Sequence, residues 1–288
     1  MVSSISDSFE RDFLSAPLQV QIMHCDRYEL APLFTKLFKE NQPVLEAGCG
    51  SGRWNAWFAK QGIMSTGLDW SDELCKRARS EIPECRFVTG DMQNMPFEDG
   101  EFGGLIALGS VEHIPNGPIK TLKEFHRVLK QRGIAVITVP YGGWLRRIRL
   151  LLFQPIIMLK ANKSLRGILN KKGSNGRSLK EAKKDTTMSW FPIFSCDGGG
   201  YFFYEYEFTK KQMKNFLIQS GFEIMQEFVG FGNEGILHNC GRLAASWNSE
   251  NADVDFTFLG KVLRTIIPVN VIGHMLCYVV RKHESVTD

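Results

Sequence analysis

The chain has 288 residues, of which 43% are hydrophobic and 23% are charged, as in an ordinary globular protein with one large core. Its formal net charge of +4 is too small by itself to argue for nucleic-acid binding. The seven cysteines are scattered without a CxxC pair, and no apolar run reaches the roughly 18–20 residues needed to span a bilayer. We therefore expect reduced thiols in a cytoplasmic protein.

The basic charge is concentrated in one segment. Residues 141–187 contain twelve Lys or Arg against two acidic residues, which gives +10 and leaves −6 for the rest of the chain. Within this segment, Trp144–Phe153 mixes basic and bulky apolar residues. That composition is typical of an interfacial membrane helix, and it also suits a lid over an anionic substrate or a solvated helix packed on the domain. We expect peripheral contact of residues 144–187 with an anionic membrane at its inner face.

The first part of the chain predicts an arm, a helix, a strand and a glycine-rich turn. Residues 1–27 form the N-terminal arm, and apolar residues at helical spacing predict a helix over Tyr28–Phe38. The short apolar run Val44–Glu46 predicts a strand that leads into three alternating glycines and then a helix with an aromatic face. Glycine allows backbone to approach a ligand where a Cβ would clash, and the helix start offers free N–H groups. The glycines are Gly48, Gly50 and Gly52.

Strands and helices then alternate with short connections. Ser71 is a good N-cap for the second helix, and a further amphipathic helix is predicted over Asn116–Lys130. The pattern predicts a parallel sheet with helices on both faces, in which ligands lie beyond the carboxyl ends of the strands. The four further strands are expected at Ile63–Leu68, Arg86–Thr89, Leu105–Leu108 and Ile134–Val139.

The regular alternation stops at Pro140. Residues 141–205 combine basic, Gly/Ser-rich and aromatic pieces, and we expect an insertion there. Residues 206–288 complete the core of residues 28–140, with a helix after Thr209 and strands at Phe222–Val229 and Ile272–Arg281.

Polar side chains stand where the predicted strands end. A carboxylate such as Asp69 can accept both hydroxyls of a ribose, and Trp70 can lie against an adenine ring. Asp91 can accept an adenine amino proton beside the Met92 backbone, while Glu46 can hold an ammonium group. A lone aspartate at such a position is more often a helix cap. Several of them at one sheet edge predict a site for a nucleoside with a cationic, amino-bearing tail.

Five motifs in this order resemble the class I S-adenosylmethionine-dependent methyltransferases, in particular the small-molecule branch typified by ubiquinone- and menaquinone-biosynthesis enzymes. The resemblance covers residues 28–140 and resumes at FTKKQMKNFLIQSGFEIM and the final strand. It implies an α/β, Rossmann-like three-layer sandwich. The sheet would have seven mostly parallel strands with a reversed last strand, and a lid would be inserted after strand five. The motifs are VLEAGCGSG, GLDWS, GDMQNMPF, GGLIALGSVEHIP and LKEFHRVLKQRGIAVITVP.

The resemblance also implies a set of residues that hold S-adenosyl-L-methionine. One group would cradle the methionine part, Asp69 would bind the ribose, Trp70, Asp91 and Met92 would bind the adenine, and Gly109 would present its backbone to the amino acid. The cradle would consist of Glu46, Gly48, Cys49, Gly50 and Gly52.

Two positions depart from the family pattern. Phe102 is followed by Gly103 where relatives usually have aspartate, and we expect only a packing consequence. Some relatives bind a divalent metal through Glu-x-x-Glu-His, but Gly109 occupies the first Glu position here, so no metal is expected. Glu112 and His113 remain as candidate catalytic groups. His113 would act as a general base, or else as a structural histidine that caps the following loop.

The acceptor would be a small molecule, of lipid-like or isoprenoid type, methylated at oxygen, carbon or nitrogen. Tyr201, Tyr204 and Tyr206 would line its pocket, or form an ordinary strand. Nucleic acid is not expected, because the Asn-Pro-Pro-Tyr-like tetrapeptide of base methyltransferases is absent after strand four. The alternatives are a non-catalytic scaffold of this fold at a membrane surface and a nicotinamide-dependent dehydrogenase. Arg53 stands where the dehydrogenase motif needs its third glycine.

Overall fold

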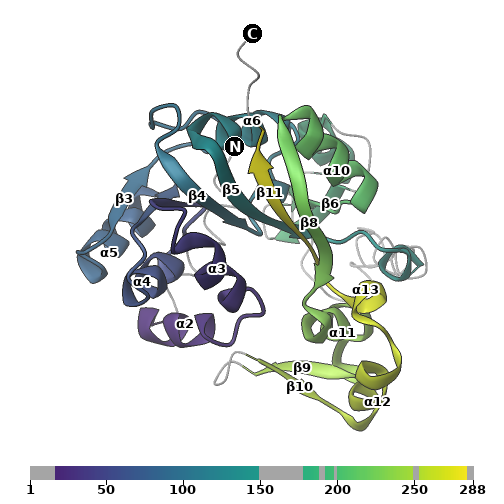
Figure 1. Ribbon diagram of the computed structural model, residues 1–288. Helices are drawn as coiled ribbons and strands as arrows, with labels where there is room; N and C mark the ends of the chain where they lie inside the picture. The colour runs from purple at the N-terminus through teal and green to yellow at the C-terminus, as the bar shows by residue number, and fades with distance from the viewer. Residues whose placement is uncertain (1–16, 149–177, 188–191, 198–199, 249–252, 284–288) are drawn as a thin grey trace. The chain divides into compact units, whose positions relative to one another are not determined.

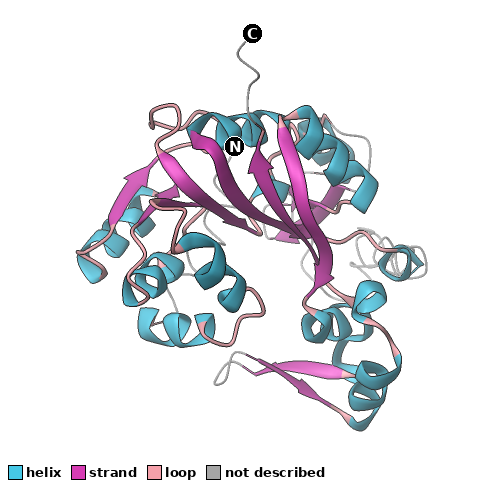
Figure 2. Cartoon of the chain, viewed as in Figure 1, coloured by secondary structure: helices cyan, strands magenta, loops and turns pink. Residues whose placement is uncertain are grey.

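A seven-stranded sheet organises the chain (Figures 1 and 2). The computed structural model describes residues 17–148, 178–187, 192–197, 200–248 and 253–283. The strand order is β3-β2-β1-β4-β5-β11-β8. The strands are β1 (Val44–Ala47), β2 (Ser65–Asp69), β3 (Arg86–Thr89), β4 (Phe102–Leu108), β5 (Leu129–Pro140), β8 (Phe222–Gly230) and β11 (Met275–Lys282).

The first five strands are all parallel, and β1 pairs with both β2 and β4. The last strand, β11, lies between β5 and β8 and runs opposite to β8 (Figure 1). All four residues of β1 are buried, as are most of those of β4, because helices cover both faces of the sheet. The predicted Rossmann-like sandwich with a reversed last strand is therefore confirmed.

Helices on the two faces bury apolar side chains against the sheet. Ser71 caps α5 as predicted, since its Oγ accepts a hydrogen bond from the Leu74 N–H at 3.2 Å. The aromatic face of α4 is part of the core, with the Trp54 ring 5.0 Å from that of Phe34 and 5.4 Å from that of Trp57. These helices are α2 (Leu18–Cys25), α3 (Ala31–Phe38), α4 (Arg53–Lys60), α5 (Asp72–Glu81), α6 (Ile119–Val128) and α10 (Lys210–Gln219), with the 3-10 turn η1 at Val111–His113.

The boundary between α6 and β5 differs from the prediction. The helix begins after Pro118 and ends at Val128, and the strand begins at Leu129, five residues earlier than expected. Leu129 pairs with Phe102, but the next paired residue is Ile134, opposite Gly104. The residues between them form an irregular stretch in which Arg132 has a φ of 62°. The residues of such a bulge do not alternate between apolar and polar, so the sequence pattern does not show that the strand has already begun.

Gly103, the residue that departs from the family pattern, has the packing role that was expected. A Cβ on Gly103 would lie 2.8 Å from the carbonyl carbon of Asn41 and 2.8 Å from the carbonyl oxygen of Gln42. The neighbouring Gly104 faces the Phe38 ring, which an added Cβ would approach to 2.5 Å. The start of β4 therefore packs directly on the segment that leads into β1.

The chain divides into two compact units. Unit 1 contains residues 1–139, 210–228 and 276–288 and carries most of the sheet, whereas unit 2 contains residues 140–209 and 229–275. Unit 2 thus joins the expected insertion to a stretch that we had assigned to the completion of the core. Its elements are α9 (Leu179–Ala182), η2 (Lys183–Asp185), β6 (Pro192–Asp197), β7 (Gly200–Tyr206), α11 (Gly232–Cys240), η3 (Gly241–Leu243), β9 (Ala245–Asn248), β10 (Asp253–Phe256), α12 (Phe258–Ile266) and α13 (Val269–Ile272).

Unit 2 contains two antiparallel hairpins, β6–β7 and β9–β10. Both of its chain segments begin and end close together. The Phe208 N–H donates to the Pro140 carbonyl at 2.9 Å, the His274 N–H donates to the Gly230 carbonyl at 3.1 Å, and the Tyr141 N–H donates to the His274 carbonyl at 2.8 Å. The basic stretch at 149–177 lies outside the described residues. Among the helices that the structure does describe, none is long and apolar enough to cross a membrane.

Candidate cofactor site

The glycine-rich turn after β1 lies against the end of β2. Gly48, Gly50 and Gly52 have φ values of 81°, 53° and 78°, which L-residues with side chains rarely adopt. The N–H groups of Gly48 and Cys49 both donate to the Leu68 carbonyl, at 2.8 and 3.0 Å. The turn therefore needs its glycines for conformation, and its backbone is fixed before any ligand binds.

Asp69 holds this turn to the helix that follows β2. One carboxylate oxygen accepts a hydrogen bond from the Gly50 N–H at 2.8 Å, and the other accepts from the Ser71 N–H at 3.0 Å. The side chain is 7% exposed. Each carboxylate oxygen has a second lone pair, so these bonds leave acceptor capacity for hydroxyl groups. The sequence offered two alternatives for Asp69, a helix cap and a ribose acceptor. The two are compatible, because the carboxylate can bind both N–H groups and still accept from a ligand.

Glu46 is a buried carboxylate at the end of β1. It is 5% exposed, and its Oε2 has no hydrogen-bond partner among the described residues. Burial raises the pKa of Glu46 well above its usual range, against the opposing effects of Arg53 and of a hydrogen bond from the Asn55 N–H. A buried acceptor without a donor is costly, and an ammonium group would supply both the donor and the opposite charge.

The loops after β3 and β4 come together at Gly48. A Cβ added at Gly48 would lie 2.8 Å from Ser110 Cβ and 3.6 Å from Met92 Cε, so only glycine leaves this space open. The Ser110 hydroxyl donates to the Ala47 carbonyl at 3.1 Å. Gly109 is fixed by its N–H, which lies 3.1 Å from Thr138 Oγ1. The loops after β1, β3 and β4 are far apart in the sequence, and they thus meet around Gly48 at the edge of the sheet.

The loop after β3 carries the predicted adenine contacts. Asp91 is exposed, its Oδ1 accepts from the Gln93 N–H at 2.8 Å, and Met92 is half-buried. Trp70, at the end of β2, is 46% exposed, which leaves an indole face available to a flat ring.

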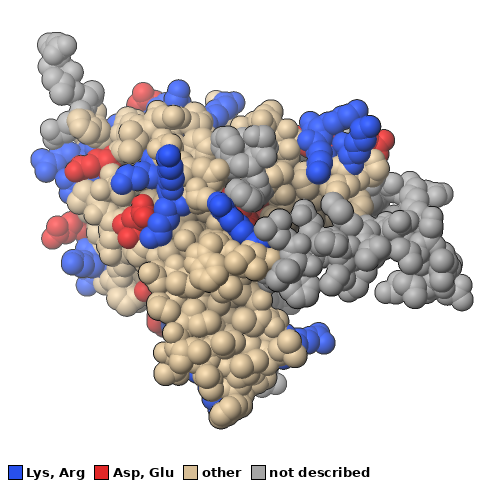
Figure 3. Space-filling model, turned by 90° about the vertical axis from the view of Figure 1, so that its right-hand side faces the viewer, with Lys and Arg blue, Asp and Glu red and all other residues tan. Residues whose placement is uncertain are grey.

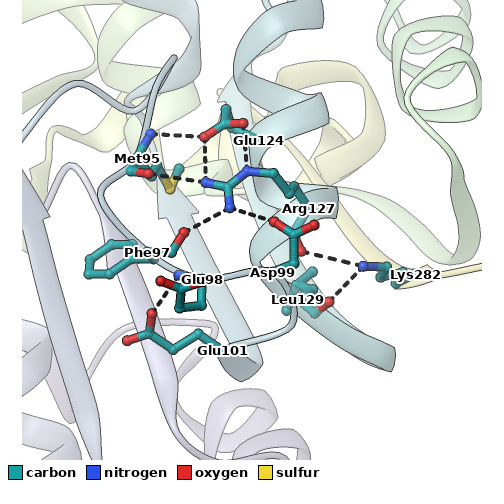
Figure 4. Close-up of polar contacts among 9 residues, drawn as sticks. All are labelled: Met95, Phe97, Glu98, Asp99, Glu101, Glu124, Arg127, Leu129 and Lys282. Carbon is teal, nitrogen blue, oxygen red and sulfur yellow. Dashed lines mark hydrogen bonds and ion pairs between the residues drawn. The ribbon is translucent and has the colours of Figure 1, made fainter.

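Arg127 on α6 fastens this loop to the rest of unit 1 (Figure 4). Its guanidinium donates to the carbonyls of Met95 at 3.0 Å and Phe97 at 2.7 Å, and it pairs with Asp99 at 2.8 Å. Glu124, one turn earlier on α6, accepts from the Met95 N–H at 2.8 Å and from Arg127. We did not predict this network. The Glu124–Arg127 spacing of i, i+3 was the available signal for the pair, but not for its contacts with the loop.

The remaining predicted residues differ in exposure. Cys49 is buried and packs in a core cluster, and its pKa is raised by a hydrogen bond with Cys75 and by burial, so only its backbone faces the turn. Glu112 is 2% exposed and His113 is half-buried, both in η1 directly after Gly109–Ser110.

The three tyrosines proposed for the acceptor lie on β7 of unit 2. Tyr206 is fully buried, with its ring 4.7 Å from that of Phe203 and 6.3 Å from that of Phe208, so it packs inside the unit. Tyr201 and Tyr204 are half-buried. Of the three, these two have surface that an acceptor can reach.

A methyltransferase-domain family model matches residues 45–137. The chain is 31% identical to a demethylmenaquinone methyltransferase of Chlorobaculum tepidum over 169 residues, which is 54% of this chain and 68% of that protein. It is 29% identical to an uncharacterized methyltransferase of Synechocystis over 110 residues, 38% of this chain and 52% of that protein. A sterol 4-C-methyltransferase of Caenorhabditis elegans is 31% identical over 121 residues, 40% of this chain and 34% of that protein.

Solved structures share the fold. A SAM-dependent methyltransferase from Methanosarcina mazei superposes with a TM-score of 0.57 at 17% identity, covering 90% of this chain and all of the other. The motif order, the strand order and the relatives agree. The chain belongs to the family of S-adenosylmethionine-dependent methyltransferases.

Proposed function

We propose that this chain transfers the methyl group of S-adenosylmethionine to a small, lipid-like or isoprenoid-type acceptor. The observation that carries the cofactor part is Glu46, a buried carboxylate with an unsatisfied oxygen beside a turn that admits no Cβ. A dinucleotide would bring phosphates to this turn, and a buried carboxylate would repel them. A methionine tail brings an ammonium group, which Glu46 attracts.

The other residues would divide the cofactor among them. Asp69, already fixed by two backbone N–H groups, would accept the ribose hydroxyls through its remaining lone pairs. Trp70 would lie on the adenine face, and Asp91 with the Met92 backbone would bind the adenine edge. Gly48, Gly50 and Gly52 would let the backbone pack closely on the methionine part.

The bound cofactor supplies a methyl group on a positively charged sulfur. The transfer would require an acceptor atom aligned with that methyl group and a base that takes the acceptor proton. We propose His113 as this base, since it is half-buried and follows the Gly109–Ser110 loop directly. Glu112, buried beside it in η1, would orient the imidazole or favour its protonated form. The rest of the reaction requires alignment of the two reactants, which the fixed loops provide.

The acceptor class rests on the relatives. The names of two relatives refer to a menaquinone precursor and a sterol, which are both apolar ring compounds. The half-buried Tyr201 and Tyr204 would contact such an acceptor. Residues 144–187 would act as its lid or as a contact with anionic membrane.

Isothermal titration with S-adenosylmethionine and with its demethylated product tests the cofactor assignment. We expect both to bind the wild-type chain and to bind at least about tenfold more weakly to Asp69→Asn, which loses charge-assisted hydrogen bonds. Asp72→Asn is the matched control, because Asp72 is an exposed residue in the first turn of α5. If the chain bound NADH tightly and did not bind S-adenosylmethionine, this result would favour the dehydrogenase alternative and refute our proposal.

Incubation with methyl-deuterated cofactor and extracted lipids tests the acceptor assignment. We expect mass spectrometry to find a deuterated methyl group in the apolar, quinone-containing fraction. A chain that binds the cofactor but labels no fraction, lipid or polar, would support the scaffold alternative. If only polar metabolites were labelled, the assignment as a methyltransferase would stand and the proposal of a lipid-like acceptor would be refuted.

A further inference from the structure

The outer side of α12 exposes large apolar side chains. Phe258 is 85% exposed, Ile266 is 66% exposed and Leu259 is 48% exposed, and Val262 lies between them on the same side of the helix. Leu243, 79% exposed, is adjacent, because its carbonyl accepts the Thr257 hydroxyl at 2.9 Å. We call these five residues the α12 face. A contiguous apolar patch of this kind on a folded surface marks an interaction site.

The packing of α12 on unit 2 holds this face outward. A Cβ on Gly260 would lie 2.0 Å from the Ala244 carbonyl oxygen, so the glycine side of the helix must face that backbone. Thr257 fixes the helix start, since its N–H donates to Ala244 at 2.9 Å and its hydroxyl accepts from Gly260 at 3.2 Å. Leu263 packs on the inner cluster around Val254. The helix therefore cannot rotate to bury the α12 face without losing its contact at Gly260.

The charged side chains of α12 itself are all basic. Lys261 and Arg264 are the only charged residues between 257 and 272, and both are basic and exposed. The nearest acidic residues in the described sequence are Asp253 and Asp255 on the preceding strand β10, and Asp255 is bonded to Asn248. Figure 3 shows few charged side chains over the lower part of the surface, where β9, β10 and α12 lie. The helix thus combines an exposed apolar stripe with a basic flank, in which Lys261 borders the stripe and the Arg264 guanidinium lies over the Phe256 ring of β10, 5.5 Å from its centroid.

The size of the patch selects the kind of partner. A stable protein interface involves about 20–30 residues on each side, whereas the α12 face has five apolar side chains on and beside a helix about 13 Å long. An interfacial helix needs only one apolar stripe at headgroup depth and basic residues that meet anionic lipid. We propose that the α12 face docks unit 2 on an anionic membrane surface, with Phe258 and Ile266 inserted and Lys261 at the headgroups.

This proposal does not depend on the proposed function. It also differs from the expectation for residues 144–187, because it concerns another segment of the chain and rests on exposed side chains that the structure describes. The two can be separated by substitutions that leave residues 144–187 intact.

Vesicle flotation of the full chain tests the proposal. The probes are phosphatidylcholine vesicles with and without phosphatidylglycerol, and the variant is Phe258→Glu/Ile266→Glu. Its matched control is Met64→Glu/Ile218→Glu, which places the same charges at apolar residues of unit 1 that are 67% and 55% exposed. A further variant, Lys261→Gln/Arg264→Gln, removes the basic flank. All variants should melt within a few degrees of the wild type, because the substituted residues are exposed.

We expect the wild type and the control to float with anionic vesicles, and Phe258→Glu/Ile266→Glu to bind at least about tenfold more weakly. Lys261→Gln/Arg264→Gln should lose its preference for phosphatidylglycerol, and wild-type binding should weaken with added salt. A reduction of less than tenfold for the glutamate variant would overturn the proposal. It would also be overturned if the lipid-free wild type sedimented as a dimer that this variant converted to monomer, since the α12 face would then bind a second copy.

Discussion

At the scale of single residues, the proposed role of Glu46 has opposite effects on cofactor binding and on the stability of the free protein. Its carboxylate is buried and its pKa is raised by burial, so the folded state holds a proton that the unfolded state releases at lower pH. Stability therefore falls as pH rises above the unfolded value of 4.5 toward the raised folded value. On the proposed function, the site keeps a group that destabilises the free protein because the ammonium group of the ligand requires it.

We predict that Glu46→Gln raises the melting temperature at pH 8 and weakens S-adenosylmethionine binding by at least about tenfold. Removal of the buried charge should be worth about 1 kcal/mol or more, or about 2–4 °C for a chain of this size. Thermal unfolding at pH 5 and pH 8 and isothermal titration measure the two effects. The increase in melting temperature should be smaller at pH 5 than at pH 8. A lower melting temperature of Glu46→Gln at pH 8 would instead show that Glu46 is ion-paired in the free protein.

Gly103 shows how a departure from a family pattern follows from packing. We predict that Gly103→Ala lowers the free energy of unfolding by about 1–3 kcal/mol, because the new Cβ meets rigid backbone at Asn41 and Gln42. Urea unfolding gives this quantity. Gly62→Asn is the control, since Gly62 has a positive φ but no atom within 4 Å of an added Cβ. Equal losses in the two variants would mean that the close contact at Gly103 relaxes without extra cost, since Gly103 has no positive φ.

At the scale of elements, the loop after β3 depends on α6 for its position. Arg127 donates to two loop carbonyls, and Glu124 accepts from a loop N–H, so both directions of hydrogen bonding are used. Each carboxylate partner raises the pKa of Arg127, and Arg127 lowers that of Glu124. The helix acts as a clamp on the loop that carries Asp91 and Met92.

We predict that Arg127→Ala weakens cofactor binding several-fold while the pH dependence of the methyl transfer keeps its shape. The amide of Met95 should exchange hydrogen faster, because its acceptor Glu124 loses its partner. Hydrogen exchange with mass spectrometry and titration measure both effects. Arg86→Ala is the control, since Arg86 makes an ion pair with Glu101 at the other side of the loop. If exchange at Met95 is unchanged, Arg127 does not position the loop.

At the scale of the whole molecule, each unit carries a carboxylate whose pKa is raised by loss of contact with water. In unit 2, burial and the neighbouring Glu207 raise the pKa of Glu205 to about 7, against the effect of Arg146. Arg146 pairs with both carboxylates and contacts His274 Nδ1 at 2.9 Å. The His274 ring in turn stacks on that of His238, with centroids 4.0 Å apart. These five residues all belong to unit 2.

We predict that Glu205→Gln stabilises unit 2 at pH 8 by up to about 3 kcal/mol and leaves it unchanged at pH 4.5. The folded value lies above the unfolded 4.5, so the carboxylate costs stability progressively between pH 4.5 and about 7. Differential scanning calorimetry across this range measures the effect. Glu73→Gln, at an exposed site on α5, is the matched control for the same substitution at the surface. If Glu205→Gln raised the stability equally at every pH, titration of Glu205 would be excluded as the cause.

Much of unit 1 was predictable because its signals are local. The glycines of the turn, the Ser71 cap and the apolar strands each occupy a few consecutive residues, and the family motifs give their order. The contacts of Arg127 were not predictable, because they join a helix to backbone about 30 residues away. The composition of unit 2 was missed for the same reason: residues 140–209 and 229–275 carry no pattern that indicates their association.

The hydrogen bonds at the base of unit 2 have an evolutionary consequence. Pro140 meets Phe208, and Gly230 meets His274, so each segment leaves and rejoins its neighbouring strands at almost one point. Either segment can then lengthen, shorten or be replaced by recombination while the strands that flank it keep their register. A descendant of such a chain could therefore acquire a different unit 2 and inherit the strands and loops of unit 1 unchanged.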